Sequence, residues 1–279
     1  MNQHLHKGRN ILAGFFLLAF FYACSSSPYA ATNKLYKKQV KALAKTLTAI
    51  PKDSVLADSM KVPANWVGTI NFGLRKPNAV IIHHTAQKSC EQTLKTFTLQ
   101  RTQVSSHYVI CEDGTLHHML NDYLRAWHAG AGKWGGQSDI NSSSIGIEID
   151  NDGTETFTEA QLNTLLGLLA TLKKTHGIPA ANFIGHGDIA PTRKVDPNVN
   201  FPWQRLAESG YGLWYSDTTG VNVPLEFNPT HALRIIGYDV SNVAAATQAF
   251  RRHFLTVEAP GELTEAEKRV LFVLMGKYL

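Results

Sequence analysis

The chain has 279 residues, of which 44% are hydrophobic and 18% charged, a composition typical of a globular protein with a substantial core. Lys and Arg number 27 against 22 Asp and Glu, and a net charge of +5 without a basic arm interleaved with aromatics gives no reason to expect a nucleic-acid partner. Three cysteines are too few for a disulfide-rich miniprotein and lack the spacing of a zinc ribbon.

The N-terminal segment predicts export. After a weakly basic start, residues 11–23 form an apolar run that is too short to span a bilayer and has the size of a signal-peptide core. Cys24 and three serines follow, which resembles a bacterial lipobox in which Cys24 is lipidated and becomes the mature N-terminus. Phe21 stands where lipoboxes prefer Leu, so ordinary cleavage near Ala30 is the alternative. We expect a signal peptide over residues 1–23 in either case.

Residues 24–64 are expected to form an anchor, a basic helix and a linker. The predicted helix, residues 33–49, carries several lysines and no acidic residue, and one face holds its apolar side chains: Tyr36, Val40, Leu43 and Leu47. This helix either lies on an anionic surface or docks on the main domain through its apolar face.

Residues 65–217 predict an α/β domain. Short apolar or alternating runs indicate strands at 79–82, 107–110, about 115–118, 144–149 and about 182–184. Helices are expected at about 89–101 and at 158–176, the second with a Thr158 capping box and a Gly177 stop. Strands and helices alternate without strict βαβ repetition, so we expect a mixed central sheet flanked by helices.

A metal-binding site is the first candidate for a functional site. His83 and His186 are predicted at strand ends, and Asp196 follows His186 by ten residues. Two imidazoles and one carboxylate suit zinc with a fourth position left to water. No H-E-x-x-H pairs the ligands on one helix, so the spacing alone leaves open that these are ordinary hydrogen-bonded loop histidines.

The loop over residues 126–136 is rich in glycine and aromatics. Glycine lets backbone approach a ligand, and Trp127 and Trp134 offer flat faces on which sugar rings stack. A mobile surface loop with one buried Trp is the alternative.

Five motifs in register carry a family resemblance. In order they are Ile82-His83-His84-Thr85-Ala86, Ser105-Ser106-His107-Tyr108, Ala126-Trp127-His128-Ala129-Gly130, Ser144-Ile145-Gly146-Ile147-Glu148, and the stretch from Gly185-His186 through Asp188 and Arg193-Lys194 to Asp196-Pro197. Over residues 77–206 the chain resembles zinc N-acetylmuramoyl-L-alanine amidases, especially their outer-membrane lipoprotein members, and is more distantly similar to phage amidase lysozymes and peptidoglycan recognition proteins.

The resemblance implies a catalytic mechanism and a cellular location. One zinc ion per chain would be held by His83, His186 and Asp196. Glu148 would handle the proton of the attacking water and Lys194 would support the developing oxyanion, whereas the alternative for each is a surface ion pair. The substrate would be the bond between N-acetylmuramic acid and L-alanine in peptidoglycan or muropeptides. We expect a monomer, anchored by lipid in the outer membrane and facing the periplasm.

Four further residues are candidates for substrate contact: His107, Trp127, His128 and Arg193. The alternative role for His107, Trp127 and His128 is to hydrogen-bond to the metal ligands and orient them. For His107, a purely structural role in the strand is an equal alternative. Arg193 would meet a carboxylate of the stem peptide or simply be exposed.

Two features remain open. Cys90 and Cys111 are available for a disulfide in an oxidising compartment, which the sequence neither requires nor excludes. Residues 218–279 predict a small all-α domain of three helices, and residues 237–238 and 249–254 resemble the peptidoglycan-binding module often fused to such amidases. A plain helical extension of the amidase domain is the alternative.

Two rival functions remain open, and the first would use the same substrate groove as the amidase. One is a noncatalytic peptidoglycan-binding lipoprotein, which retention of both Glu148 and Lys194 argues against. The other is a zinc peptidase that cuts within the peptide stem.

Overall fold

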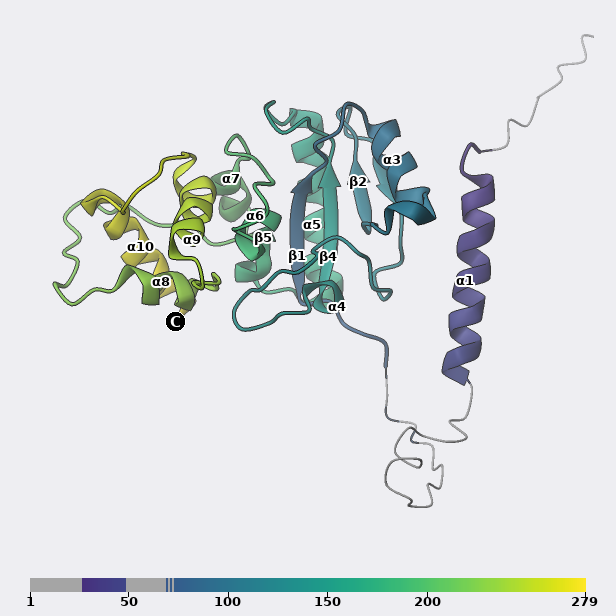
Figure 1. The fold of residues 1–279 in the computed structure, drawn as a ribbon, viewed down its shortest axis with the longest axis horizontal. Coiled ribbons are helices and arrows are strands. Elements are labelled where there is room, and N and C mark those ends of the chain that lie inside the picture. Colours follow the sequence, from purple (N-terminus) through teal and green to yellow (C-terminus); the bar gives the residue numbers. More distant parts are fainter. Residues whose placement is uncertain (1–26, 49–68, 70, 72) are drawn as a thin grey trace, which may run out of the picture. The chain divides into compact units, whose positions relative to one another are not determined.

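The computed structural model describes residues 27–48, 69, 71 and 73–279, which fall into two compact units before and after Gly68 (Figure 1). The predicted signal peptide, the lipidation site Cys24 and most of the predicted linker lie outside the described residues. Within the described part, no helix combines the length and the hydropathy that a membrane crossing needs.

The first unit contributes one described helix, α1 (Ala30–Thr48), close to the predicted basic helix. None of its side chains is buried, and Leu43 and Leu47 on its apolar face are exposed. The helix has no acidic residue in its first turn and ends on a turn that contains Lys45.

Among the described residues, the second unit holds the five strands and every helix other than α1. In chain order the elements are β1 (Ala79–His84), α3 (Cys90–Thr98), η1 (Gln100–Thr102), β2 (Tyr108–Ile110), β3 (Leu116–His118), α4 (Ile140–Ser143), β4 (Ser144–Ile149), α5 (Glu159–His176), η2 (Ala180–Asn182), β5 (Phe183–Gly185), α6 (His186–Ile189), α7 (Trp203–Glu208), α8 (Pro229–Ile236), α9 (Val243–Phe250), η3 (Arg251–Leu255) and α10 (Glu265–Tyr278).

The five strands form one mixed sheet in the order β3-β2-β4-β1-β5. Strands β2, β4, β1 and β5 run parallel, and β3 pairs antiparallel with β2 through the predicted hairpin. Three parallel strands therefore end side by side at one edge of the sheet. The predicted mixed sheet flanked by helices is confirmed.

Helix α5 covers one face of this sheet (Figure 1). Its start is fixed by the predicted capping box of Thr158 and Gln161, and it ends at Gly177, whose φ of 68° suits glycine. Its leucines pack on the side chains of Val80 and Ile82 from β1 and on the isoleucines of β4. This core fixes the strand register, because a slip of one residue would turn every strand side chain to the opposite face.

The opposite face of β1 carries a smaller cluster that includes Ile81, Ile184 and Ile189. Its members come from β1, from β5, from α6 and from the glycine-rich loop. The loop and the short helix α6 are thus held against the sheet by burial.

The C-terminal helices α8, α9 and α10 pack around a separate hydrophobic cluster. Helix α9 ends at Phe250, and the chain continues without a break as a π-helical turn, η3. Most side chains of the two stretches that resemble a peptidoglycan-binding module are buried, including Tyr238, Phe250 and His253. These residues therefore form the core of the C-terminal helices and not an exposed binding surface.

Candidate active site

The site lies where parallel strands β1, β4 and β5 end. In the register of the sheet His83 stands opposite Glu148, and Ile82 stands opposite Gly185, so that His186 follows directly beyond the end of β5. Side chains after the carboxyl ends of parallel strands gather at one sheet edge, which is where α/β folds place ligands. The sheet thus brings together residues more than a hundred positions apart.

Three potential metal ligands converge at this edge. Nδ1 of His83 lies 2.9 Å from Nδ1 of His186 and 3.1 Å from Oδ2 of Asp196. The distance from Nδ1 of His186 to Oδ2 of Asp196 is 3.0 Å. Tetrahedral zinc with bonds of about 2.0–2.1 Å separates its ligand atoms by about 3.3 Å. The residues fit a divalent ion in spacing and in chemistry, and the structure contains a possible metal site of the predicted composition.

Burial and neighbouring groups keep two of these ligands, His83 and Asp196, in the form that binds metal. Burial, and then the adjacent His186, lower the pKa of His83 to about 4, so its imidazole is neutral at pH 7. Burial opposes ionisation of Asp196, but hydrogen bonds with His186 and His83 outweigh it and hold the pKa of that carboxyl well below its usual value. A neutral imidazole and a carboxylate are the forms a cation requires.

Glu148 lies at the same centre, and Lys194 is near enough for its charge to act on Glu148. The Glu148 carboxylate is buried, and its Oε1 lies 4.0 Å from Nδ1 of His83. Burial, followed by the charge of Asp196, raises the pKa of Glu148 well above its usual value, and the ammonium of Lys194 opposes this. A carboxylate with a raised pKa beside a metal centre is suited to accept and return a proton near neutral pH.

His128 supports a ligand. Its Nδ1 lies 3.1 Å from Nε2 of His83, and its Nε2 lies 3.2 Å from Oγ of Ser144, which donates to the carbonyl of Ile140 at 2.6 Å. If His83 binds metal through Nδ1, its Nε2–H donates to His128, whose own Nε2–H donates to Ser144. This chain orients the imidazole of His83, and it favours the supporting role that the sequence left open for His128.

A glycine makes room for that chain. A Cβ atom at Gly146 would lie 2.5 Å from the ring of His128, so no other residue fits here without displacing it. Burial, and then His83, lower the pKa of His128 well below its usual value, which keeps the ring neutral and able to accept a hydrogen bond from the Nε2–H of His83.

His107 is completely buried, so its ring does not reach substrate. The backbone N–H of Gly146 donates to its Nδ1 at 3.0 Å, and its Nε2 lies 3.1 Å from the carbonyl of Leu124. Nearby, the half-buried guanidinium of Arg75 donates to several carbonyls, including those of Ser142 and Leu124. The structure therefore favours the structural role for His107.

Trp127 directly precedes His128 in the glycine-rich loop, and Arg193 directly precedes Lys194 in the segment after α6. The Trp127 side chain is 54% exposed, and the guanidinium carbon of Arg125 lies 4.1 Å from the centre of its ring. Arg193 donates to the carbonyls of Ala129 and Ala131, which holds the loop in place. Trp127 thus offers an aromatic surface, while part of the Arg193 guanidinium is already engaged.

Trp134, the other aromatic of the loop, packs inward. Its ring meets that of Tyr238 edge to face at 5.1 Å, and it joins the cluster of the C-terminal helices.

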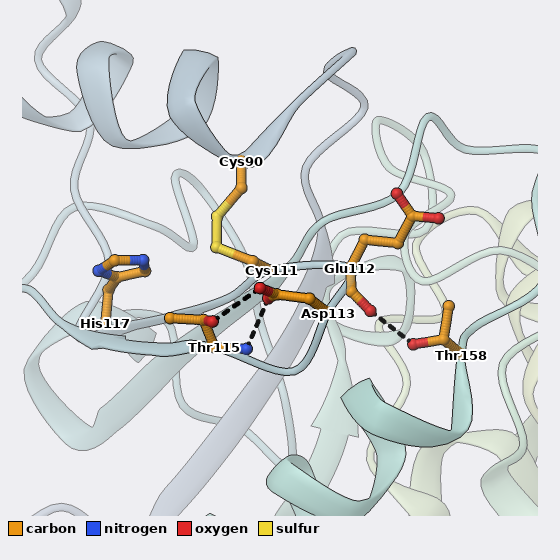
Figure 2. A pocket seen from close by; sticks show the side chains of 7 residues that line it. All are labelled: Cys90, Cys111, Glu112, Asp113, Thr115, His117 and Thr158. Carbon is orange, nitrogen blue, oxygen red and sulfur yellow. Dashed lines mark hydrogen bonds between the residues drawn. A yellow bond between two sulfur atoms is a disulfide. The ribbon is translucent and has the colours of Figure 1, made fainter.

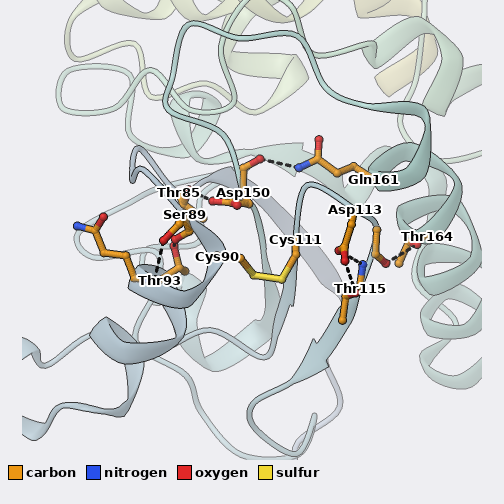
Figure 3. The surroundings of a disulfide bond; sticks show 12 residues. Thr85, Ser89, Cys90, Thr93, Cys111, Asp113, Thr115, Asp150, Gln161 and Thr164 are labelled. Carbon is orange, nitrogen blue, oxygen red and sulfur yellow. Dashed lines mark hydrogen bonds between the residues drawn. A yellow bond between two sulfur atoms is a disulfide. The ribbon is translucent and has the colours of Figure 1, made fainter.

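A second group of metal-binding residue types lies away from this centre. Cys90 and Cys111 are joined in a disulfide with their Cα atoms 5.2 Å apart, which connects the start of α3 to the end of β2 (Figure 3). Both sulfurs also line an open hollow of about 500 Å³ together with His117 (Figure 2). Because the disulfide removes both thiolates, His117 is the single remaining ligand of this group, and it does not make a metal site.

Two residues near the centre were not among the predicted ones. From the sequence, Ser144 has no role beyond its place at the head of a strand and of one quoted motif, although Ser144 anchors His128. Asp188 stands inside the last motif, between the ligands His186 and Asp196, and its position there was its only signal in the sequence.

Comparisons with known proteins agree with this geometry. The profile of the N-acetylmuramoyl-L-alanine amidase family matches residues 73–199. The N-acetylmuramoyl-L-alanine amidase AmiD of Escherichia coli is 31% identical over 231 residues, which cover 71% of this chain and 82% of the relative. The 1,6-anhydro-N-acetylmuramyl-L-alanine amidase AmpD of Haemophilus influenzae is 35% identical over 112 residues, or 40% of this chain and 61% of that relative.

Solved structures show the same likeness. The complex of Escherichia coli AmiD with anhydro-N-acetylmuramic acid-L-Ala-D-gamma-Glu-L-Lys has a TM-score of 0.66 at 28% identity, covering 76% of this chain and 93% of that one. AmpDh3 of Pseudomonas aeruginosa in complex with anhydromuramic pentapeptide also has a TM-score of 0.66, at 26% identity, covering 78% of this chain and 99% of that one.

Proposed function

The chain belongs to the N-acetylmuramoyl-L-alanine amidase family, and from that premise we propose that it hydrolyses the amide bond between N-acetylmuramic acid and L-alanine with zinc as its metal. The observation that carries the proposal is the convergence of His83, His186 and Asp196 within 3.1 Å of one another, with Glu148 beside them. Two neutral imidazoles and one carboxylate are a ligand set of catalytic zinc sites.

An amide is a poor electrophile with a poor leaving group, so its hydrolysis needs activated water and a stabilised oxyanion. A bound zinc ion supplies Lewis acidity toward the carbonyl and lowers the pKa of water. Glu148 accepts a proton from the attacking water and returns it to the departing nitrogen of L-alanine, a role worth about 10²- to 10⁴-fold in rate. The ammonium of Lys194, close enough to influence the pKa values of Glu148 and His83, donates to the oxyanion.

The substrate is a peptidoglycan-derived muropeptide. The two solved relatives named above hold anhydromuramic peptides, which supports the same class of ligand here. We assign the exposed ring of Trp127 to the sugar, because a flat aromatic face stacks on a pyranose ring. The part of the Arg193 guanidinium that is not bonded to the loop is assigned to a carboxylate of the stem peptide.

The test is digestion of a purified muropeptide by the full chain, with products identified by mass spectrometry. We expect release of the intact stem peptide, its loss after chelation, and its return with added zinc. Glu148→Gln is the matched control, which should keep zinc and lose about 10²- to 10⁴-fold in rate.

Other products would decide between the rivals. Fragments cut inside the stem would replace the amidase with a peptidase, and tight binding without any turnover would leave only the peptidoglycan-binding protein. A Glu148→Gln variant as active as the wild type would remove the proton-transfer role of that residue.

We also propose that the protein is exported and held at the outer membrane by a lipid on Cys24, facing the periplasm as a monomer. The support is the apolar run over residues 11–23 and the lipobox-like sequence that follows it. Mass spectrometry of the membrane-extracted protein should find a lipid at the mature N-terminus. Recovery of Cys24→Ser in the membrane fraction to the same extent as the wild type would contradict the anchor.

A further inference from the structure

A second buried carboxylate lies on the short helix that carries a metal ligand. Asp188 is in α6, two residues after His186, and is 3% exposed. Its Oδ2 accepts a hydrogen bond from the backbone N–H of Gly185 at 2.8 Å, which closes the turn between β5 and α6. None of the hydrogen bonds of this carboxylate goes to a metal ligand, and the proposed reaction gives it no role.

The other two donors to Asp188 come from the C-terminal helices. The hydroxyl of Tyr238 donates to Oδ1 at 2.8 Å, and Nδ1 of His253 donates to Oδ2 at 2.7 Å. Both side chains are buried. We call Asp188, Tyr238 and His253 the latch cluster.

The donors of the latch cluster are themselves held in place. The ring of His253 stacks on that of Trp203 with centroids 3.9 Å apart and planes 13° apart. The ring of Tyr238 meets Trp134, and the backbone N–H of Gly135 donates to the carbonyl of Gly237 at 2.9 Å. The C-terminal helices thus contact the sheet domain on both sides of α6 and present two fixed proton donors to its carboxylate.

Helix α6 has little freedom to compensate if these donors are lost. It has four residues, and a Cβ atom at Gly185 would lie 3.0 Å from Oδ2 of Asp188. The backbone N–H of Gly187 donates to the carbonyl of Asp196 at 2.7 Å, so a shift of α6 would move two of the three ligands together. An uncompensated buried carboxylate is strongly destabilising, and the chain would relieve it by moving α6 toward water.

We infer that Tyr238 and His253 are positioning residues for the metal site, through which the C-terminal helices fix the placement of His186 and Asp196. Residues outside the direct ligands commonly change metal affinity by about 10- to 100-fold when they are removed. The C-terminal helices are then a part of the metal-binding scaffold, whether or not they also bind peptidoglycan. This inference rests on the proposed function in one respect, that the ligands bind zinc.

The experiment is a competition titration of zinc between a chromophoric chelator and the full apo chain. We expect Tyr238→Phe and His253→Leu each to raise the zinc dissociation constant about 10- to 100-fold. His253→Asn retains a side-chain N–H near the position of Nδ1 and should recover most of the affinity. Tyr238→Phe removes one oxygen atom and keeps the ring against Trp134, so this variant decides the question even if His253→Leu does not fold.

Leu274→Ala is the matched control, because Leu274 is fully buried in the C-terminal cluster and its aliphatic side chain offers no hydrogen-bond donor to Asp188. It should lower the thermal unfolding temperature and leave the zinc dissociation constant unchanged. Unchanged zinc affinity in folded Tyr238→Phe and His253→Leu would overturn the inference, as would an equal loss of affinity in Leu274→Ala. A wild-type chain that binds no zinc would overturn the proposed function itself.

Discussion

Two clusters of histidine and aspartate lie on the two sides of α6, and they differ in what converges. In the metal site, formed by His83, His186 and Asp196, two imidazole nitrogens and one carboxylate oxygen lie within 3.1 Å of one another, and each of these atoms can offer a lone pair to a cation. In the latch cluster, three proton donors meet on one carboxylate. The same residue types are thus suited to binding a metal in one cluster and form structural hydrogen bonds in the other.

The difference shows how to distinguish a metal site from a structural one. Three atoms that can each offer a lone pair at one point are suited to share a cation, whereas a carboxylate surrounded by fixed N–H and O–H groups is already satisfied. Residue identity alone does not distinguish a metal site from a structural cluster, because both clusters contain buried His and Asp side chains. The comparison yields predictions in which the two sides of α6 respond differently.

Removal of a direct ligand should have the largest effect. Asp196→Ala should reduce bound zinc from one per chain to near zero and bring muropeptide hydrolysis to background, because two imidazoles remain without the carboxylate. On the other side of α6, Asp188→Asn should retain one zinc per chain at saturating metal. Elemental analysis of the two variants measures this, and equal zinc content in both would break the comparison.

The support of His83 by His128 should come next. His128→Ala removes the acceptor of the Nε2 proton of His83, and we expect the zinc dissociation constant to rise about 10- to 100-fold. The neighbouring side chain Trp127 is exposed, so Trp127→Ala should leave that constant unchanged. The chelator competition measures both, and an unaltered affinity in folded His128→Ala would show that His83 needs no such support.

The latch cluster should respond to alkali. Burial, and then the negative charge of Asp188, raise the pKa of Tyr238 well above that of an unfolded tyrosine, about 10. Its stabilisation is therefore fully present below about pH 10 and is lost as pH rises toward the folded pKa, by up to about 1.4 kcal/mol per pH unit. Urea unfolding of the wild type between about pH 9 and 11 should show a steeper loss than Tyr238→Phe. If the free energy of unfolding fell equally with pH in the wild type and in Tyr238→Phe, ionisation of Tyr238 would not contribute to the loss of stability.

The smallest effect is expected at the rim of the site. Trp127→Ala should raise KM about 2- to 10-fold with kcat little changed, because a stacked aromatic contributes about 0.5–1.5 kcal/mol to binding. Steady-state kinetics with a defined muropeptide measures the two constants. A fall in kcat at constant KM would assign Trp127 to the transition state and not to the sugar.

The sequence predicts the metal site better than it predicts the latch cluster. His83, Glu148 and His186 follow or end recognisable parallel strands, and such strand ends meet at one edge of a sheet. The bond between Asp188 and His253 joins positions 65 residues apart and depends on how helices pack on the sheet domain, which no local pattern encodes. For the same reason the burial of His107 and the inward side of His128 became clear only in the structure.

The most direct test of the account is the location of zinc in a crystal of the full chain, by anomalous scattering at the zinc absorption edge. The account predicts one strong peak within about 2.0–2.2 Å of Nδ1 of His83, Nδ1 of His186 and Oδ2 of Asp196. A zinc peak elsewhere, with these three side chains bonded only to one another, would contradict it.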